Sequence, residues 1–223
     1  GTSAHQNGEV TTDSIAVSGQ AFNLKANDNA YVGFKYTLGE VHGLGTKSNA
    51  LAQLETWYVN NLKSYEAKID INAGFCGDRT SYTYDSSGNY IEGGGTGTIY
   101  TVYGPYFRVR KEKKPIMSCP NMEDLYTTST SIKGNKGLTY PIGLISADET
   151  VIAGNAGFSN SNNKVYYLYN GQSYWTISPD GISNNQVYMF IVNGNGSISI
   201  SGANSGVEAL RPVINLRSDV KLT

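Results

Sequence analysis

Apolar side chains recur at helical spacing in one stretch of the chain, residues 48–65. The apolar positions follow one another at intervals of three or four residues: Leu51, Leu54, Tyr58, Leu62 and Tyr65. Such spacing places them on one face of an α-helix. The side chain of Ser48 or Asn49 can accept the first free backbone N–H groups, so the helix is predicted to begin there. Trp57 lies beside the apolar stripe and is predicted to pack beneath it.

The last third of the chain has a different pattern, in which short apolar runs alternate with turn dipeptides. Five runs have the composition of strands: residues 165–169, 174–178, 187–192, 197–200 and 210–216. The dipeptides between them are typical of tight turns between paired strands: Asn170-Gly171, Asp180-Gly181 and Asn193-Gly194. The pattern therefore predicts an antiparallel β meander, and no linker separates it from the preceding residues.

The rest of the chain adds strand-like runs at residues 31–36, 98–109 and 138–145. Residues 77–107 are rich in Tyr, Ser, Thr and Gly, and we expect them to form a long loop-rich insertion. Ser146 and Glu149 have the spacing of a capping box, which predicts the start of a second helix.

The fold class is therefore predicted as α+β, a twisted antiparallel sheet with one or two main helices in a single domain at 15–223. Residues 1–14 are polar and are expected to be disordered or to be an appended sequence.

Charge and composition argue against some functional classes of protein and favour others. The chain has 17 Lys and Arg against 18 Asp and Glu, a net charge of −1, and only 16% of its residues are charged. This balance argues against binding to nucleic acid or to an anionic membrane through bulk charge. The 26 Gly and 17 Tyr residues suit extracellular β-rich domains, in which Tyr provides large and rigid contacts. We expect an exported, cell-surface or extracellular protein, attached to a membrane only through an N-terminal anchor outside this sequence.

The chain has two cysteines, Cys76 and Cys119, and both lie beside Gly or Pro in sequence that favours turns. In an exported protein we predict a disulfide between them, closing a loop of about 44 residues. The alternative is two separate buried thiols. Two cysteines without a neighbouring histidine are too few for a zinc site. The Asn-rich fragments 27–29 and 193–196 lack the carboxylates of a calcium loop, so no metal or other cofactor is expected.

A short basic segment at residues 108–114 carries five positive charges and one Glu. A nucleic-acid site would need more such charge and interleaved aromatic residues, so we interpret the segment as the solvated end of a hairpin. His42 could act as a base, but a single histidine before a Gly-rich turn usually has a structural role. No nucleophile elbow, zinc-protease, phosphate-loop or dinucleotide motif is present. We therefore expect no enzyme activity.

Three parts of the chain occur in a recognisable order: residues 54–61 with 74–79, residues 140–149, and residues 174–179 with 210–216. Together they resemble DUF6273, a family of exported surface domains of gut Firmicutes and Mollicutes. The ending Trp175-x-x-Ser-Pro … Arg211-Pro-x-x-Asn-Leu is also similar to the C-type-lectin fold in its formylglycine-generating-enzyme-like form. The same fold serves as the variable binding protein of diversity-generating retroelements. The resemblance thus implies a C-type-lectin-like domain.

The resemblance also implies roles for particular residues. Trp175 is expected to anchor the core, and Arg211 to pair with a carboxylate such as Asp148 or Glu208. Formylglycine-generating enzymes use a cysteine pair in the C-terminal region, whereas both cysteines here lie before residue 120. The enzymatic activity of those relatives is therefore not implied.

The contact surface is expected on the Asn- and Tyr-rich turns after residue 155, where side chains can stack and hydrogen-bond with little loss of entropy. The candidate ligand-binding residues are Asn160, Asn162, Asn163, Tyr167, Tyr169, Asn170, Gln172, Tyr174, Asp180, Asn184, Asn185 and Gln186. The same residues fit an ordinary core and turn role, in which case the surface is expected at residues 80–107.

The function expected from these features is extracellular binding of a protein or glycan ligand, for adhesion or receptor recognition. A structural surface or pilus-like subunit with homotypic contacts is the alternative. A glycan-active enzyme is the third reading, although no pair of catalytic carboxylates can be assigned.

Overall fold

The computed structural model of the protein describes residues 17, 19–155, 158, 166 and 168–221. Its helices are η2 (Asn29–Val32), α1 (Asn49–Asn61), η3 (Lys63–Lys68), η4 (Tyr106–Glu112), η5 (Met122–Asp124) and α2 (Ala147–Ile152). Its strands are β1 (Lys35–Tyr36), β2 (Thr46–Lys47), β3 (Phe75–Cys76), β4 (Ser81–Tyr84), β5 (Tyr90–Glu92), β6 (Thr101–Tyr103), β7 (Leu125–Tyr126), β8 (Tyr174–Ser183), β9 (Gln186–Val192) and β10 (Ile198–Gly202).

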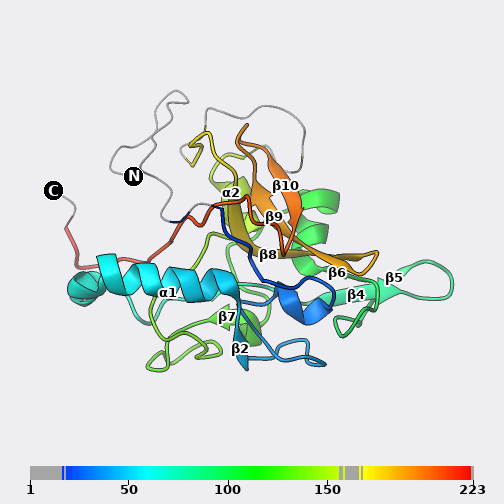
Figure 1. Ribbon diagram of the computed structural model, residues 1–223, viewed down its shortest axis with the longest axis horizontal. Coiled ribbons are helices and arrows are strands. Elements are labelled where there is room, and N and C mark those ends of the chain that lie inside the picture. The colour runs from blue at the N-terminus through cyan, green and yellow to red at the C-terminus, as the bar shows by residue number, and fades with distance from the viewer. Residues whose placement is uncertain (1–16, 18, 156–157, 159–165, 167, 222–223) are drawn as a thin grey trace.

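The main sheet has six antiparallel strands in the order β10-β9-β8-β6-β4-β5. Two small two-stranded sheets, β1 with β2 and β3 with β7, lie outside it. Figure 1 shows β8, β9 and β10 above α1, with the β4–β5 hairpin projecting at one end of the molecule. The α+β class and the antiparallel sheet agree with the sequence prediction. Residues 77–107 are rich in loops, as predicted, but they also supply β4, β5 and β6, so this stretch is part of the sheet.

Helix α1 carries its apolar side chains into the main core. Ser48 caps the helix, and its Oγ accepts a hydrogen bond from the backbone N of Leu51 at 3.2 Å. Leu54 and Tyr58 are fully buried one and two turns further along. The α-helix ends at Asn61, four residues before the predicted end of the stripe. Tyr65 therefore lies in η3 and is exposed.

Trp175 of β8 is the largest fully buried side chain of the core. Its ring packs edge-on against Phe22 at a centroid distance of 5.9 Å. Its Nε1 donates a hydrogen bond of 2.6 Å to the carbonyl of Gln20, which satisfies the polar atom of the indole. The prediction that Trp175 anchors the core is confirmed.

The opposite face of the sheet is covered by η4 and α2. Val109 of η4 and Ala147 of α2 form a buried cluster with Phe190 of β9 and Ile198 of β10. The predicted capping box begins α2, because Ser146 and Glu149 each accept a hydrogen bond from the backbone N of the other. The sheet is therefore packed on both faces.

One predicted turn, Asp180-Gly181, is wrong. Both residues lie inside β8, where the register with β9 shifts between Pro179 and Gly181. Asp180 is the extra residue of this bulge, which also explains how a proline fits within a ten-residue strand. The chain reverses instead at Asn184-Asn185, whose φ values of 51° and 57° are those of a tight hairpin turn.

Four further strand predictions fail in whole or in part, either because the residues have no continuous partner strand or because the chain is helical there. Residues 210–216 and 138–145 form isolated bridges and no extended strand. Residues 31–36 contain η2 and the two-residue strand β1. Of residues 98–109, only 101–103 are a strand, and the chain then enters the π-helix η4.

The basic segment is not a solvated hairpin end. Arg108 of η4 donates to both oxygens of Asp148, at 2.8 and 2.9 Å, and to Asp78 at 2.8 Å. Arg110 donates to both oxygens of Asp180, at 2.9 and 3.0 Å. These two cations therefore tie η4 to the sheet and to α2.

The disulfide between Cys76 and Cys119 is present in the structure. We predict that the double variant Cys76→Ala/Cys119→Ala is less stable by about 2–4 kcal/mol, since the bond restricts the unfolded chain. Urea unfolding of the parent under oxidising and reducing conditions measures the same effect. If reduction left the unfolding midpoint unchanged, the bond would have no stabilising role.

Candidate functional site

The structure divides the predicted contact residues into three groups. Four of them lie outside the residues that the structure describes: Asn160, Asn162, Asn163 and Tyr167. Four are buried at no more than 6% exposure: Tyr169, Asn170, Tyr174 and Asp180. Gln172, Asn184 and Asn185 are exposed, and Gln186 is half-buried. Among the predicted contact residues that the structure describes, only Gln172, Asn184, Asn185 and Gln186 therefore reach the surface.

The four buried residues have interior partners that explain their position. Tyr174 donates a hydrogen bond of 3.2 Å from its hydroxyl to the carbonyl of Leu168. The guanidinium of Arg211 lies 5.3 Å from the ring centre of Tyr174 and also bonds the carbonyl of Leu168. Burial raises the pKa of Asp180, and the Arg110 guanidinium opposes that change.

The expected pairing of Arg211 with Asp148 is wrong, because Asp148 accepts both of its bonds from Arg108. Among the described residues, no ion pair joins Arg211 to Glu208 either. Arg211 instead donates to a backbone carbonyl and stacks on an aromatic ring. Sequence spacing alone could not distinguish these two ways of stabilising a half-buried cation.

A continuous group of aromatic rings lies at the other end of the sheet, and we call it the tyrosine cluster: Tyr82, Tyr84, Tyr90, Tyr100, Tyr106 and Phe107. Tyr84 stacks on Tyr100 with a centroid distance of 4.9 Å and an interplanar angle of 15°. Tyr84 and Tyr90 are opposite each other in β4 and β5, with their rings 4.5 Å apart. The rings come from β4, β5, the residue before β6 and η4, so a rigid framework holds them.

The hydroxyls of the tyrosine cluster form a chain of hydrogen bonds. Tyr84 donates to Tyr90 at 2.8 Å, and Tyr84 and Tyr100 approach at 3.5 Å. Tyr90 and Tyr106 share a bond of 3.3 Å. Burial among the rings, with the bond to Tyr84, raises the pKa of Tyr100 above its ordinary value. The Tyr100 hydroxyl therefore remains protonated at neutral pH and can donate to a ligand.

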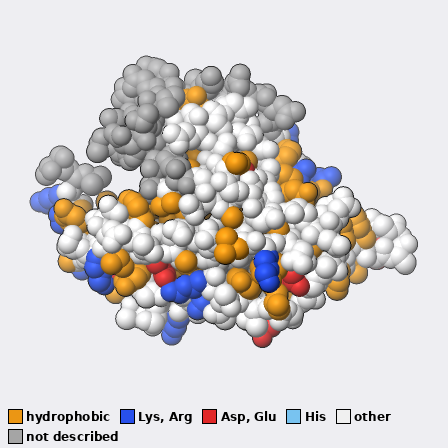
Figure 2. All heavy atoms as spheres, in the orientation of Figure 1, with side chains coloured by type: hydrophobic (Ala, Val, Ile, Leu, Met, Phe, Trp, Pro, Cys, Tyr) orange, Lys and Arg blue, Asp and Glu red, His pale blue; other side chains and the backbone are white. Residues whose placement is uncertain are grey.

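Much of this aromatic surface is open to solvent. Tyr84 is 43% exposed and Tyr100 39%, and the neighbouring Ile91 and Ile99 are 46% and 51% exposed. Figure 2 shows hydrophobic side chains gathered at the base of the projecting β4–β5 hairpin. An exposed apolar group of this kind, next to polar hydroxyls, is typical of an interaction site.

The exposed Asn184-Asn185 turn lies at the same end of the sheet as the tyrosine cluster. Thr101 of β6 pairs with Ile182 of β8 in antiparallel register. Tyr100 immediately precedes Thr101, and the turn follows Ile182 after one residue. Continuing the two strands past this pair therefore brings Tyr100 and the turn to the same edge. The exposed part of the predicted surface and the tyrosine cluster form neighbouring regions.

His42 belongs to a second polar site, which sequence reasoning did not assemble. Its Nδ1 lies 3.0 Å from Oδ1 of Asp124, a carboxylate that is fully buried. Arg79, only 1% exposed, bonds the same carboxylate through its Nε at 2.7 Å and its backbone N at 2.6 Å. On its outer side His42 lies near Asn121 and Glu123. His42, Asp124 and Arg79 thus form an ion-pair network.

The contact between His42 and Asp124 predicts how the stability of the protein depends on pH. The hydrogen bond to Asp124 raises the pKa of His42 above its ordinary value, against a smaller opposing effect of burial. The stabilisation from protonated His42 is therefore complete below about pH 6.5, the unfolded value, and is lost as pH rises through the higher folded value. The difference in melting temperature between the parent and His42→Ala should shrink with rising pH. His5→Ala is the matched control, and a difference that is constant with pH would contradict the assignment.

The described part of the chain offers no group of three His, Cys, Asp or Glu side chains that could hold a metal ion. Nor do its described helices include one that is long and apolar enough to cross a bilayer. Three groups of described residues are candidate sites: the tyrosine cluster, the exposed Asn184-Asn185 turn, and the network of His42, Asp124 and Arg79.

Comparison of the chain with models of protein families, with curated proteins and with solved structures finds no match. The resemblance of its C-terminal motifs to DUF6273 and to C-type-lectin-like domains therefore stays a prediction from sequence. The side chains that the structure brings together are therefore the basis for a proposed function.

Proposed function

We propose that this chain is an extracellular, non-catalytic binding domain of C-type-lectin-like type, displayed on a bacterial surface, that recognises a protein partner through the tyrosine cluster. The observation that carries the proposal is the cluster itself, in which rings held by β4, β5, the residue before β6 and η4 leave Tyr84 and Tyr100 about two-fifths exposed. The disulfide between Cys76 and Cys119 supports an oxidising location.

The chemistry around the cluster favours a protein over a glycan as the ligand. Two exposed aliphatic residues are next to rings of the cluster in sequence, Ile91 after Tyr90 and Ile99 before Tyr100, although Ile91 pairs with Thr83 and so lies on the opposite face of the hairpin from Tyr84 and Tyr90. Arg110 and Lys111 lie 5.0 and 5.5 Å from the ring centre of Tyr106, so cations border the aromatic surface. Tyrosine and arginine are enriched among the energetic centres of protein interfaces. The Asn184-Asn185 turn adds amide groups at the edge.

The proposal predicts the effect of removing the exposed rings. The double variant Tyr84→Ala/Tyr100→Ala should weaken binding about thirtyfold or more, if each ring contributes about 1–2 kcal/mol. Its circular dichroism spectrum should match that of the parent. Binding is measured by flow cytometry on intact epithelial cells and by surface capture on immobilised mucosal proteins.

Tyr65→Ala is the matched control, since Tyr65 is 56% exposed on η3 and lies outside the cluster. Asn184→Gly/Asn185→Gly removes the amides while retaining the positive φ angles, and should weaken binding less than the Tyr double variant. Unchanged binding by a folded Tyr84/Tyr100 variant, or a parent that binds neither cells nor proteins, would contradict the proposal.

A second candidate function is a structural subunit with homotypic contacts, and the edge of the sheet favours it. β5 is the last strand of the sheet order, and its Ile91 is 46% exposed. An open edge strand can pair with another chain, although three residues make a short edge. Sedimentation velocity distinguishes the two functions: assembly that grows with concentration and is abolished by Ile91→Lys would favour the subunit.

A further inference from the structure

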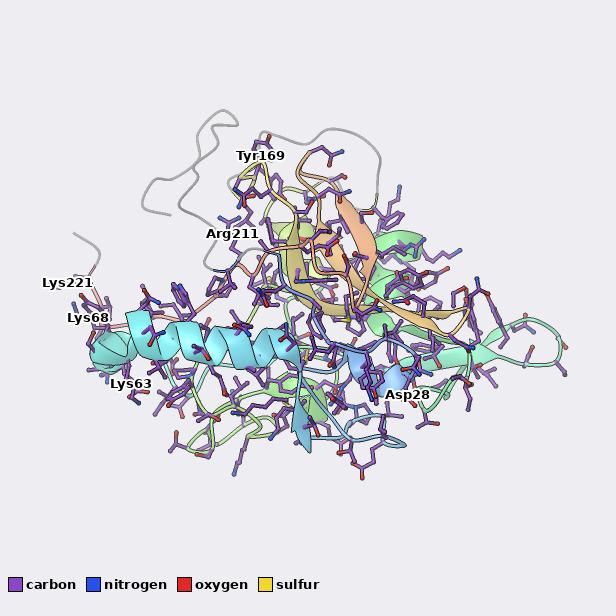
Figure 3. All side chains as sticks on the ribbon, in the orientation of Figure 1. Asp28, Lys63, Lys68, Tyr169, Arg211 and Lys221 are labelled. Carbon is purple, nitrogen blue, oxygen red and sulfur yellow. A yellow bond between two sulfur atoms is a disulfide. The ribbon has the colours of Figure 1, made fainter. Side chains whose placement is uncertain are left out.

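A wide, open groove of about 950 Å³ lies at the end of α1 that is opposite to the tyrosine cluster. Three separate segments line it, namely residues 66–72, 128–141 and 217–219. Figure 3 shows Lys63 and Lys68 of η3 near Lys221 at this end of the molecule. The volume is in the range of sites that bind small molecules.

Hydrogen bonds hold the three segments in place without a ligand. The backbone N of Asp70 donates to the carbonyl of Asn215 at 2.7 Å, and that of Arg217 donates to Lys68 at 3.0 Å. Thr128 donates from its hydroxyl to the carbonyl of Ile71 at 2.8 Å. The walls are thus joined to one another, and a ligand would meet a preformed surface.

The lining combines hydroxyls with a narrow apolar strip. Exposed hydroxyls come from Ser129, Thr130, Thr139 and Ser218. Ala67 and Ile71 supply accessible apolar surface, whereas Ile69, 3% exposed, and Pro141 also line the groove but are buried. No described aromatic ring lines this groove, in contrast to the tyrosine cluster. A ligand that matches it needs many hydroxyl groups together with small C–H faces, and sugars have both.

The charges at the groove nearly cancel. Glu66 accepts a bond of 2.6 Å from Lys63 and one of 3.4 Å from the hydroxyl of Tyr58. Asp219 forms a two-bond pair with Arg217, at 2.9 and 3.0 Å. These two carboxylates are thereby oriented and paired with cations, whereas the third carboxylate of the lining, Asp70, accepts from the backbone N of Asn72 at 2.8 Å. The remaining lone pairs of all three can accept from ligand hydroxyls. A strongly anionic ligand would meet more carboxylates than cations in this lining.

We propose that this groove, formed by residues 66–72, 128–141 and 217–219, binds a short neutral oligosaccharide. The inference concerns a different surface from the proposed protein-binding function and does not depend on it. Carboxylates and hydroxyls would accept and donate bonds to sugar hydroxyls, and Ala67 and Ile71 would contact the C–H faces of the sugar rings. The protein would then have two binding surfaces, one at each end.

The test is a titration of ¹⁵N-labelled full-length protein with maltotetraose, cellotetraose and the tetramer of N-acetylglucosamine, followed by NMR. At least one of these neutral probes should shift the amide signals of residues 66–72, 128–130 and 217–219. Ser129→Trp places a ring in the groove and should weaken that binding about tenfold or more. Ser64→Trp is the matched control, because Ser64 is exposed on η3 outside the lining, and it should bind as the parent does.

Thr130→Ala/Ser218→Ala removes two exposed hydroxyls without adding bulk and keeps the test valid if the tryptophan variant misfolds. It should also weaken binding. Tetragalacturonate, a chitosan tetramer and a Gly/Ser peptide are the charged and peptide probes. The proposal is overturned if no neutral tetrasaccharide shifts groove amides at millimolar concentration, or if a charged or peptide probe alone does so. Tyr84→Ala/Tyr100→Ala should leave the titration unchanged, which separates this outcome from failure of the protein-binding function.

Discussion

Asp124→Ala is expected to lower the free energy of unfolding by about 3–5 kcal/mol, because it breaks a fully buried ion pair. The variant leaves the guanidinium of Arg79, 1% exposed, without the carboxylate that accepts its Nε and backbone N–H. His42 loses its partner at the same time. For a chain of this length, such a loss lowers the melting temperature by about 10 °C or more. Differential scanning calorimetry measures it directly.

Asp219→Ala is the matched control for that experiment. Asp219 also accepts two bonds from an arginine, but its side chain is 66% exposed and its partner 53%. Exposed pairs of this kind contribute little, so the control should melt within about 2 °C of the parent. Equal losses in the two variants would show that burial of Asp124 does not determine its contribution.

Trp175→Ala is expected to cost about 3–5 kcal/mol, since it removes the largest fully buried side chain and leaves a cavity beside Phe22. The carbonyl of Gln20 would also lose its indole donor. Trp57→Ala is the matched control, because Trp57 is half-buried at the border of the same core and should cost less. Urea unfolding followed by circular dichroism compares the two. A Trp175 variant as stable as the parent would contradict the described packing.

The features that sequence predicts correctly are mostly local. The Ser48 cap and the Ser146–Glu149 capping box depend on residues three positions apart, and both are present. In each case, the hydrogen-bond donor and acceptor of the cap lie within a few residues of each other, so a short stretch of sequence contains both.

The features that sequence misses depend on partners distant along the chain. Asp180-Gly181 is a typical turn dipeptide, but β9 and Arg110 hold it inside a bulged strand. Asp124 unites Arg79 and His42, which lie 45 and 82 positions away, and nothing in local sequence marks the three as a group. The tyrosine cluster has a visible signal in the Tyr-rich residues 80–107, but its exposure depends on how η4 covers the sheet.

The strand order of the main sheet has a consequence for how the protein folds. The chain leaves the sheet after Tyr103 of β6 and returns only at Tyr174 of β8, yet these two strands are neighbours. Val102 pairs with Gly181, and Val17 forms a bridge with Leu210. Pairing over such separations slows folding, because long loops must close before their contacts form. An emerging chain therefore cannot complete its sheet until β8 and β9 are available, and the rings of the tyrosine cluster stay without their final support until that point.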